Sequence, residues 1–328
     1  MSGERRSPPT AAAPPLTVVV CTYNRADLLA NALQSLCQQT LSASDYEVIV
    51  VDNNCTDHTR SVVADYSAAA PSIRYCVETK QGLSHARNRG WQVARGTYVG
   101  YFDDDSKAPS HWLATGHRVV QKQAPDIFGG PYYPYYTSWR PPWFRHAYGG
   151  NSLDRQAGPL AEHEYLYGTN IFCRRDLLAE LGGFDPQLGM AGTRIGYGEE
   201  TALLMQAREL HPDLRTYYDP RLYVFHLVPT RKMRLRWVAQ EQFVGGRYAF
   251  RVFGQPGRNS VGEKIRLFRN LTRLGRELVR DSTLGCLQRD RVTYPFAQNY
   301  LYERVLKDEL YRFGETYEEL VRLFKQPV

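Results

Sequence analysis

Short runs of β-branched and aromatic residues alternate with longer amphipathic stretches in the first third of the chain. The apolar runs, each of a length that suits a buried strand, lie at residues 17–21, 47–51, 73–77 and 97–102. Helical patterns lie between them at roughly residues 26–39, 57–70 and 84–95. This alternation predicts an α/β fold with a Rossmann-like, mostly parallel sheet flanked by helices, whose ligand crevice lies beyond the carboxyl ends of the strands.

The pattern changes in the middle of the chain. Residues 131–148 are rich in Pro and aromatic residues and have neither a helical nor a strand period, so we expect a loop. Beyond it we predict helices at residues 174–185, closed by Gly182 and Gly183, and at 199–210, then strands at 214–218 and 222–226. From about residue 231 onward the patterns are helical, as in a C-terminal helical appendage.

These patterns divide the chain into a disordered tail (residues 1–15), an α/β domain (16–228) and a basic, mainly helical C-terminal region (229–328). The tail lacks the apolar segment of a signal peptide, and no later run reaches the roughly 18 apolar residues that a membrane span needs. The six cysteines show no paired spacing, so we expect free thiols. We expect a cytoplasmic protein whose only membrane contact is peripheral, on the inner face of the cell membrane.

Positive charge is concentrated in one segment. Thirteen Lys or Arg and three Glu between Pro229 and Arg280 give this segment a charge of +10, so the remainder of the +7 chain carries −3. Within it, arginines and leucines each recur at steps of three and four, at Arg266, Arg269, Arg273, Arg276 and Arg280 and at Leu267, Leu271, Leu274 and Leu278. We keep open an anionic membrane surface at residues 231–280 and a solvated or interdomain face; we expect no nucleic acid.

Polar residues follow the first two predicted strands. Thr22, Tyr23, Asn24 and Arg25 follow the first, where they would face a ligand or where Asn24 would simply cap the next helix. Asp52 ends the second, where a carboxylate can accept the imide N–H of a uracil or thymine, or a ribose hydroxyl. A turn rich in Asp, Asn and Thr explains the same residues.

Three further motifs carry candidate chemistry. Gly82 opens a helix that contains Arg87, with Lys80 just upstream, which suits a diphosphate, although neither GxGxxG nor a P-loop pattern is present. Asp103, Asp104 and Asp105 follow the fourth strand, and such adjacent carboxylates predict a Mg²⁺ or Mn²⁺ site unless they form a solvated acidic turn. His226, at the end of a strand, is either a structural residue or a third metal ligand.

The remaining candidates are a pair of glutamates and three residues of the aromatic segment. Glu199 and Glu200 open a helix, where the helix dipole alone favours acidic residues but where one carboxylate can also act as a base. Tyr135, Trp139 and Trp143 belong to the aromatic segment, whose flat faces either bind sugar rings or lipid or simply pack a long loop over the crevice.

Taken in order, the runs TYNR, VDNNCTDHT, GLSHARNRG, FDDD, GTNIFCRRD with LGGFD, and GEET resemble the inverting family-2 glycosyltransferases of GT-A fold. The resemblance spans roughly residues 16–228. It implies that Asp103 and Asp105 form a DxD metal site, and that Glu200 is the catalytic base. The family usually has Asp at this last position, so Glu199 is a second candidate for the role.

The resemblance also implies a nucleotide-sugar site. Its candidate residues are Thr22, Tyr23, Asn24, Arg25, Asp52, Asn53, Lys80, Gly82, Arg87, Asp103 and Asp104, with Asp52 at the base, Arg87 near the ribose or diphosphate, and Asp104 at the ribose-phosphate portion. The run Met233–Trp237 lacks the Gln of the QxxRW motif that processive members carry.

The expected function is inverting, metal-assisted transfer of a sugar from a nucleoside-diphosphate sugar, with UDP favoured, to a hydroxyl of a glycan, lipid-linked or protein acceptor. The expected cofactor is Mg²⁺ or Mn²⁺. A sugar nucleotidyltransferase and a non-catalytic nucleotide- or glycan-binding module are the alternatives. The absence of a Gly-rich, Lys-containing loop near the first strand counts against the former, and the acidic motifs count against the latter.

Overall fold

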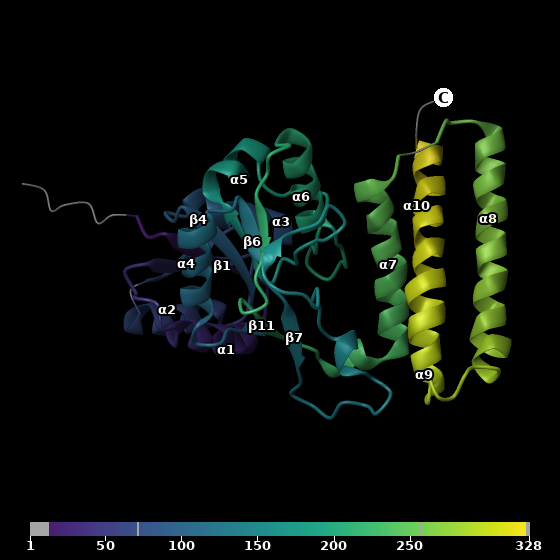
Figure 1. Cartoon of the computed structure of the whole chain (residues 1–328), viewed down its shortest axis with the longest axis horizontal. Coiled ribbons are helices and arrows are strands. Elements are labelled where there is room, and N and C mark those ends of the chain that lie inside the picture. The colour runs from purple at the N-terminus through teal and green to yellow at the C-terminus, as the bar shows by residue number, and fades with distance from the viewer. Residues whose placement is uncertain (1–12, 71, 256, 326–328) are drawn as a thin grey trace, which may run out of the picture.

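The computed structural model describes residues 13–70, 72–255 and 257–325. A mixed sheet covered by helices occupies one side of the molecule, and a layer of long helices from the C-terminal third stands beside it (Figure 1). Most of the predicted tail, residues 1–15, lies outside the described residues. The predicted α/β fold class is confirmed.

The main sheet has eight strands in the order β3-β2-β1-β4-β9-β6-β10-β8. Their bounds are β1 Leu16–Thr22, β2 Tyr46–Asp52, β3 Ile73–Val77, β4 Tyr98–Asp103, β6 Ile127–Gly129, β8 Gly158–Pro159, β9 Ile171–Arg174 and β10 Thr216–Tyr218. β1 runs parallel to β2 and β4, and β2 runs parallel to β3. Consequently the carboxyl ends of β1, β2 and β4, which carry the predicted polar motifs, lie at one edge of the sheet.

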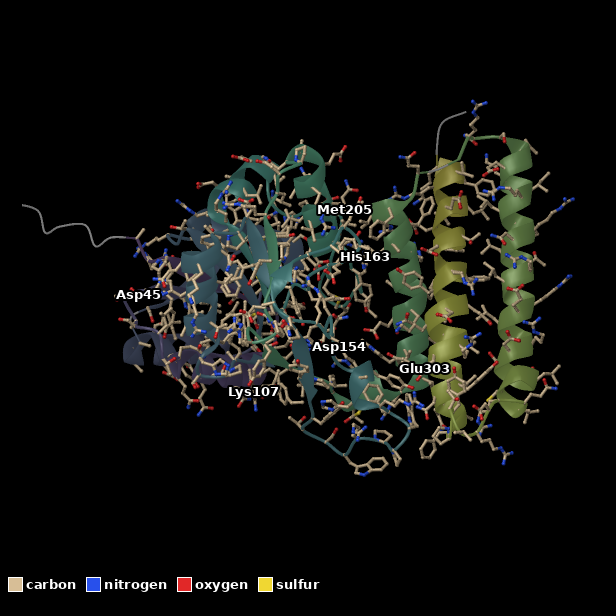
Figure 2. All side chains as sticks on the ribbon, viewed as in Figure 1. Asp45, Lys107, Asp154, His163, Met205 and Glu303 are labelled. Carbon is tan, nitrogen blue, oxygen red and sulfur yellow. The ribbon has the colours of Figure 1, made fainter. Side chains whose placement is uncertain are left out.

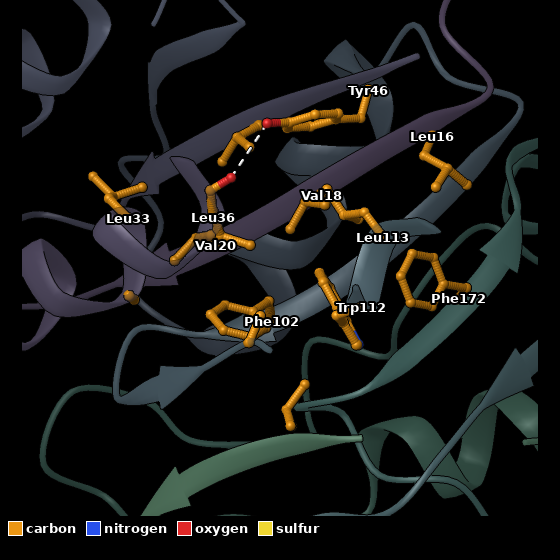
Figure 3. Close-up of a cluster of buried hydrophobic side chains, with 14 of the residues drawn as sticks. Leu16, Val18, Val20, Leu33, Leu36, Tyr46, Phe102, Trp112, Leu113 and Phe172 are labelled. Atoms are coloured by element: carbon orange, nitrogen blue, oxygen red, sulfur yellow. Dashed lines mark hydrogen bonds between the residues drawn. The ribbon is translucent and has the colours of Figure 1, made fainter. Parts of the chain in front are cut away.

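Alternating residues of the central strands build a core on each face of the sheet. Val18 and Val20 of β1 pack with helices α1, α2 and α4, whereas Val19 packs with α3, α5 and α6. Figure 3 shows the first of these cores, in which the Tyr46 hydroxyl donates a hydrogen bond to the carbonyl oxygen of Leu36 at 3.2 Å. Because both faces are covered, the central strands are apolar throughout, as the sequence pattern indicated.

Five of the six helices of the sheet region lie at predicted positions, with α5 shorter than expected, whereas no range was predicted for α4. Their bounds are α1 Ala26–Cys37, α2 Thr59–Ala69, α3 Leu83–Val93, α4 Trp112–Gln123, α5 Arg175–Leu181 and α6 Glu199–Leu210. Gly182 and Gly183 follow α5 with φ values of 74° and 81°, so both glycines adopt the left-handed conformation that closes a helix.

The expectation that residues 131–148 form a loop is wrong in part. Residues Tyr132–Tyr135 form strand β7, and His146–Tyr148 form a 3₁₀ turn. β7 pairs with β11 (Val224–Leu227), which also pairs with β5 (Ser106–Lys107), so a second sheet of three strands arises. β7 is an edge strand of this sheet, and an edge tolerates Pro134 because its missing N–H faces away from the partner strand.

The last third of the chain is helical. It comprises a 3₁₀ turn at Thr230–Met233, α7 Leu235–Phe253, α8 Val261–Arg280, a π-helical turn at Asp281–Gly285, α9 Ala297–Tyr300, a π-helical segment at Leu301–Leu310, and α10 Tyr311–Lys325. We call residues 235–325 the helical layer, because α7, α10 and α8 stand side by side with α10 in the middle (Figure 1). Among the described residues, no helix combines the length and apolarity needed to cross a bilayer.

The leucine row of α8 packs inside the helical layer. Leu267 and Leu274 are 1% and 3% exposed, and α8 packs against α10. The predicted amphipathic helix is therefore present, but its leucines cover α10 and are not available to insert into a membrane.

Gly100 of β4 lies directly across from Phe172 of β9, and a Cβ at residue 100 would lie 2.2 Å from the Phe172 ring. We expect Gly100→Ala to destabilise the protein by about 1–3 kcal/mol through overpacking, as measured by urea denaturation. In a Phe172→Leu background the added penalty of Gly100→Ala should shrink. An equal penalty in both backgrounds would show that contact with Phe172 is not the cause.

Candidate active site

The carboxyl ends of β1 and β4 open into a cleft of about 840 Å³, and residues of α7 form its opposite wall. Many of the predicted site residues line this cleft: Thr22, Tyr23, Arg25, Asn53, Arg87, Asp103, Asp104, Asp105, Glu199, Glu200 and His226. Segments that are far apart in the sequence thus contribute to one site.

The three aspartates that follow the fourth predicted strand have different partners. Asp104 accepts a hydrogen bond from Thr22 Oγ1 at 2.8 Å and one from Arg25 Nη1 at 2.7 Å. The same nitrogen donates to Asp105 Oδ2 at 3.1 Å. Burial raises the pKa of Asp104 to about 7 in spite of the nearby Arg25. Asp104 therefore connects β1 to β4 and holds Arg25 in the cleft.

Asp103, Asp105 and His226 form a cluster that could hold a metal ion. One ligand atom from each residue lies within 4.8 Å of the others. His226 Nε2 is 3.2 Å from Asp105 Oδ1 and 3.6 Å from Asp103 Oδ2, because β11 pairs His226 with Ser106, the neighbour of Asp105. Burial raises the pKa of the Asp105 carboxyl, but His226 and Arg25 outweigh burial and hold it well below its usual range.

The cluster offers the ligands that a hard divalent cation prefers. Asp105 Oδ1 is buried and lies 3.2 Å from His226 Nε2, but it accepts no hydrogen bond of good geometry among the described residues, so both atoms are left to bind a cation. Carboxylate oxygens with one imidazole suit Mg²⁺ or Mn²⁺. These residues therefore fit the predicted metal site.

Arg87 connects this cluster to the acidic start of α6. Its Nη1 donates to Glu199 Oε1 at 2.8 Å and lies 3.9 Å from Glu200 Oε2, while Nη2 lies 3.9 Å from Asp103 Oδ1. The guanidinium is buried near the rings of Tyr101 and Phe184. Arg87 is thus held by carboxylates on both sides of the cleft and its position is fixed.

The two glutamates of α6 are in different environments. Glu199 is 5% exposed, and burial together with the adjacent Glu200 raises the pKa of Glu199 to about 8, against the effect of Arg87. Glu200 Oε1 accepts a hydrogen bond from the Gly168 N–H at 3.1 Å, and its carboxylate lines the cleft. Glu199 is therefore the more buried of the two glutamates, and it is the one that Arg87 binds directly.

Asp52 and Asn24 stabilise the turn beside the cleft. Asp52 accepts hydrogen bonds from the Cys55 N–H at 2.7 Å and the Tyr75 hydroxyl at 2.6 Å, and it is not among the residues that line the cleft. The Asn24 side chain accepts from the Thr56 N–H at 2.6 Å. Nucleotide contacts by these two residues stay predictions.

Lys80 and Gly82 also lie outside the cleft lining, but both are hydrogen-bonded to Asn53, which does line the cleft. The Asn53 amide donates to the Lys80 carbonyl oxygen at 2.7 Å and accepts from the Gly82 N–H at 2.8 Å. Gly82 has a φ of 148°, a conformation that favours glycine. Both residues therefore shape the loop before α3, and their contact with a ligand stays a prediction.

None of the three predicted acceptor residues lines the cleft. Trp143 is buried in a small apolar cluster with Phe144, and Trp139 is exposed. The Tyr135 hydroxyl donates to the Asp105 carbonyl oxygen at 3.1 Å. The aromatic segment is also fixed to the helical layer by an ion pair of 2.8 Å between Arg145 and Glu303, the residue labelled at the lower end of that layer in Figure 2.

Sequence reasoning missed the wall that the C-terminal third contributes. Residues of this wall include Arg231, Lys232, Trp237, Gln240, Glu241, Tyr248 and Tyr311. Positions 237, 241 and 248 are spaced by four and seven, so they share one helical face. This spacing is the only sign of the cleft wall in the sequence. The same spacing is expected of a helix face that simply packs against the sheet region.

The sequence profile of glycosyl transferase family 2 matches residues 17–182, which are 166 of the 328 residues. Glucosyl-dolichyl phosphate glucuronosyltransferase of Haloferax volcanii is 26% identical over 286 residues, which cover 83% of this chain and 90% of that protein. GalNAc(5)-diNAcBac-PP-undecaprenol beta-1,3-glucosyltransferase of Campylobacter jejuni is 35% identical over 118 residues, 35% of this chain and 38% of that one.

Solved GT-A structures have the same fold. Mannosyltransferase PcManGT from Pyrobaculum calidifontis, in complex with GDP-Man and Mn²⁺, superposes with a TM-score of 0.57 at 20% identity, covering 96% of this chain and 76% of that one. Staphylococcus aureus TarS 1-349 in complex with UDP-GlcNAc superposes with a TM-score of 0.54 at 16% identity, covering 94% of this chain and 90% of that one. The chain is a glycosyltransferase and belongs to glycosyl transferase family 2.

Proposed function

We propose that this enzyme transfers a sugar from a nucleoside-diphosphate sugar to an acceptor hydroxyl, with inversion at the anomeric carbon. The observation that carries the proposal is that one cleft contains both the Asp103–Asp105–His226 cluster and the Glu199–Glu200 pair. Direct displacement needs stabilisation of a leaving diphosphate and a base for the attacking hydroxyl, and these two groups supply them.

On the donor side, Asp103, Asp105 and His226 would hold Mg²⁺ or Mn²⁺. The ion, when bound, supplies positive charge that stabilises the departing diphosphate. Arg231 and Lys232 line the same cleft and offer further cations to its oxygens. The complex of PcManGT with GDP-Man and Mn²⁺ supports this assignment.

For the nucleotide we favour UDP, which the TarS complex with UDP-GlcNAc supports. Thr22, Tyr23 and Asn53 line the cleft beyond β1 and β2, at the edge of a parallel sheet where nucleotides bind. Arg87 cannot reach freely for a phosphate because its guanidinium is bound to Glu199. We therefore propose that it positions the two acidic groups.

We propose Glu200 as the base. Both glutamates line the cleft, but Glu199 is buried and its carboxyl group accepts a hydrogen bond from Arg87 at 2.8 Å, so Glu200 is the one that is open to an acceptor hydroxyl. The acceptor hydroxyl loses its proton to Glu200 as its oxygen bonds to the anomeric carbon, and the bond from that carbon to the diphosphate oxygen breaks. Because the acceptor attacks the face opposite the leaving group, the configuration inverts.

The acceptor would enter along α7. Trp237 and Tyr248 present aromatic rings to the cleft, and the buried Trp237 indole N–H has no hydrogen-bond partner among the described residues. Two of the relatives named above carry lipid-linked sugars in their names, a dolichyl phosphate and a PP-undecaprenol. We propose a lipid-linked glycan acceptor, and therefore an enzyme that works at an anionic membrane surface on the cytoplasmic side.

Nucleotide binding tests the donor site. We expect UDP with Mn²⁺ to raise the melting temperature of the wild type, because ligand at about 100 times its Kd adds roughly 2.7 kcal/mol of stability. Asp103→Asn/Asp105→Asn should lose the metal-dependent part of the shift. The matched control Asp65→Asn/Asp213→Asn, at exposed positions, should keep it. No shift of folded wild type with UDP, dTDP or GDP would contradict the donor site.

Two isosteric variants separate the roles of the glutamates. Glu200→Gln should lower turnover by about 10²–10⁴-fold, the usual contribution of a general base, while UDP binding stays unchanged. Glu199→Gln keeps an oxygen that can accept the hydrogen bond from Arg87 and should keep most of the turnover. The readout is UDP released from a panel of UDP-sugars with a membrane lipid extract as acceptor source. The reverse order of losses would assign the base to Glu199.

Stability should also depend on pH through Glu199. Its folded-state pKa of about 8 lies above the ordinary value of 4.5, so the folded state binds more protons between these two values. The contribution of this residue to stability is therefore full below pH 4.5 and is lost as pH rises toward 8. In thermal melts across this range, Glu199→Gln should show a shallower decline than the wild type. Parallel declines would refute the raised pKa.

A further inference from the structure

The edge of the helical layer that is farthest from the cleft has a groove of its own. The groove lies between α8 and α10 and has a volume of about 1000 Å³. Its apolar side chains include Ile265, Phe268 and Phe324, which are 48%, 66% and 66% exposed. Large apolar side chains that gather at an exposed groove are typical of a surface that contacts another phase or molecule.

Cations surround these apolar side chains. The groove is lined by four arginines and one lysine but by a single glutamate, Glu277. Arg269 and Arg276 are exposed and have no ion pair within the described part of the chain, whereas Arg273 is paired with Glu277 at 3.0 Å. In Figure 2, nitrogen-tipped side chains project outward from α8. The groove therefore carries net positive charge that the protein itself does not neutralise.

The spacing of apolar residues along α8 explains how one side of this helix packs against the protein while another apolar side stays exposed. The leucine row that includes Leu267 and Leu274 covers α10. A second apolar row, formed by Val261, Ile265, Phe268 and Val279, recurs at helical spacing about a third of a turn away and stays exposed. The helix thus has one apolar row for the protein and another that the protein leaves uncovered.

We propose that this surface docks onto an anionic lipid bilayer. We name it the α8–α10 face, defined by Val261, Ile265, Phe268, Arg269, Arg276 and Phe324. Lipid phosphates would pair with the two unpaired arginines, and the apolar side chains would enter the boundary of the acyl chains. A bilayer satisfies both kinds of side chain at once, whereas a nucleic acid or a free phosphate would leave the apolar row exposed to water.

The helical layer separates the α8–α10 face from the cleft. α7, α10 and α8 form one layer, so the α8–α10 face and the α7 wall of the cleft belong to the same slab (Figure 1). The α8–α10 face lies at the edge of this slab opposite the α7 wall, so contact with a bilayer leaves the cleft uncovered. The inference deepens the proposed function, on which it rests for the choice of a membrane, and replaces the broader segment 231–280 with one defined face.

Co-sedimentation of the full chain with phosphatidylcholine vesicles, with and without phosphatidylglycerol, tests the proposal. We expect binding to require phosphatidylglycerol. Arg269→Glu/Arg276→Glu should weaken it by at least about 25-fold, because each cation near an anionic surface contributes about 5-fold. Ile265→Ser/Phe268→Ser should weaken the binding that persists at high salt, where charge attraction is screened.

The matched control is Arg95→Glu/Lys122→Glu, which changes the net charge equally at exposed positions of the sheet region. It should bind vesicles like the wild type, and circular dichroism should show that all variants are folded. The proposal would be overturned if the control lost as much vesicle binding as Arg269→Glu/Arg276→Glu. It would also be overturned if Arg269→Glu/Arg276→Glu bound vesicles as well as the wild type, or if the wild type did not bind them. Vesicle binding should survive in Asp103→Asn/Asp105→Asn, so failure of catalysis and failure of docking are separate outcomes.

Discussion

Arg87 is a cation that the fold surrounds almost completely, and its guanidinium lies between Glu199, Glu200 and Asp103. A buried cation without partners would be strongly unfavourable, and so would three close carboxylates without a cation. Each group therefore requires the other. The neighbouring Gly168 is part of the same constraint, because a Cβ there would lie 2.1 Å from the guanidinium. Since Arg87 comes from α3 and its partners from β4 and α6, this contact fixes Asp103 relative to Glu199 and Glu200.

The fold of the first hundred residues followed from its sequence because β1, β2 and β4 are buried on both faces and each helix has one apolar face. The rest of the sheet was harder. β9 (Ile171–Arg174) inserts antiparallel between β4 and β6, and its four residues carry no sign of direction. β7 was missed because Pro134 and the surrounding tyrosines obscure a strand period, and only pairing with the distant β11 creates the strand. Pairing between remote segments is a property of the tertiary structure.

The same distinction explains which site residues could be predicted. Asp103, Asp105 and Glu200 are recognisable because adjacent carboxylates at a strand end or a helix start already suggest chemistry. Whether His226 joins them depends on the register between β11 and β5, which the sequence does not display. Trp237 and Tyr248 could not be separated from ordinary helix packing, since the wall of a cleft and the core of a bundle use the same spacing.

The helical layer also keeps the cleft and the proposed membrane-docking face on separate surfaces. A compact three-helix bundle would bury an apolar row of each helix against both others. Here α10 stands between α7 and α8, so α7 keeps a face for the cleft and α8 keeps a second apolar row. The exposed apolar row of Val261, Ile265 and Phe268 gains nothing from contact with water. An anionic bilayer would satisfy both this row and the unpaired arginines beside it. The single layer thus has the cleft at one edge and the proposed lipid-docking face at the other.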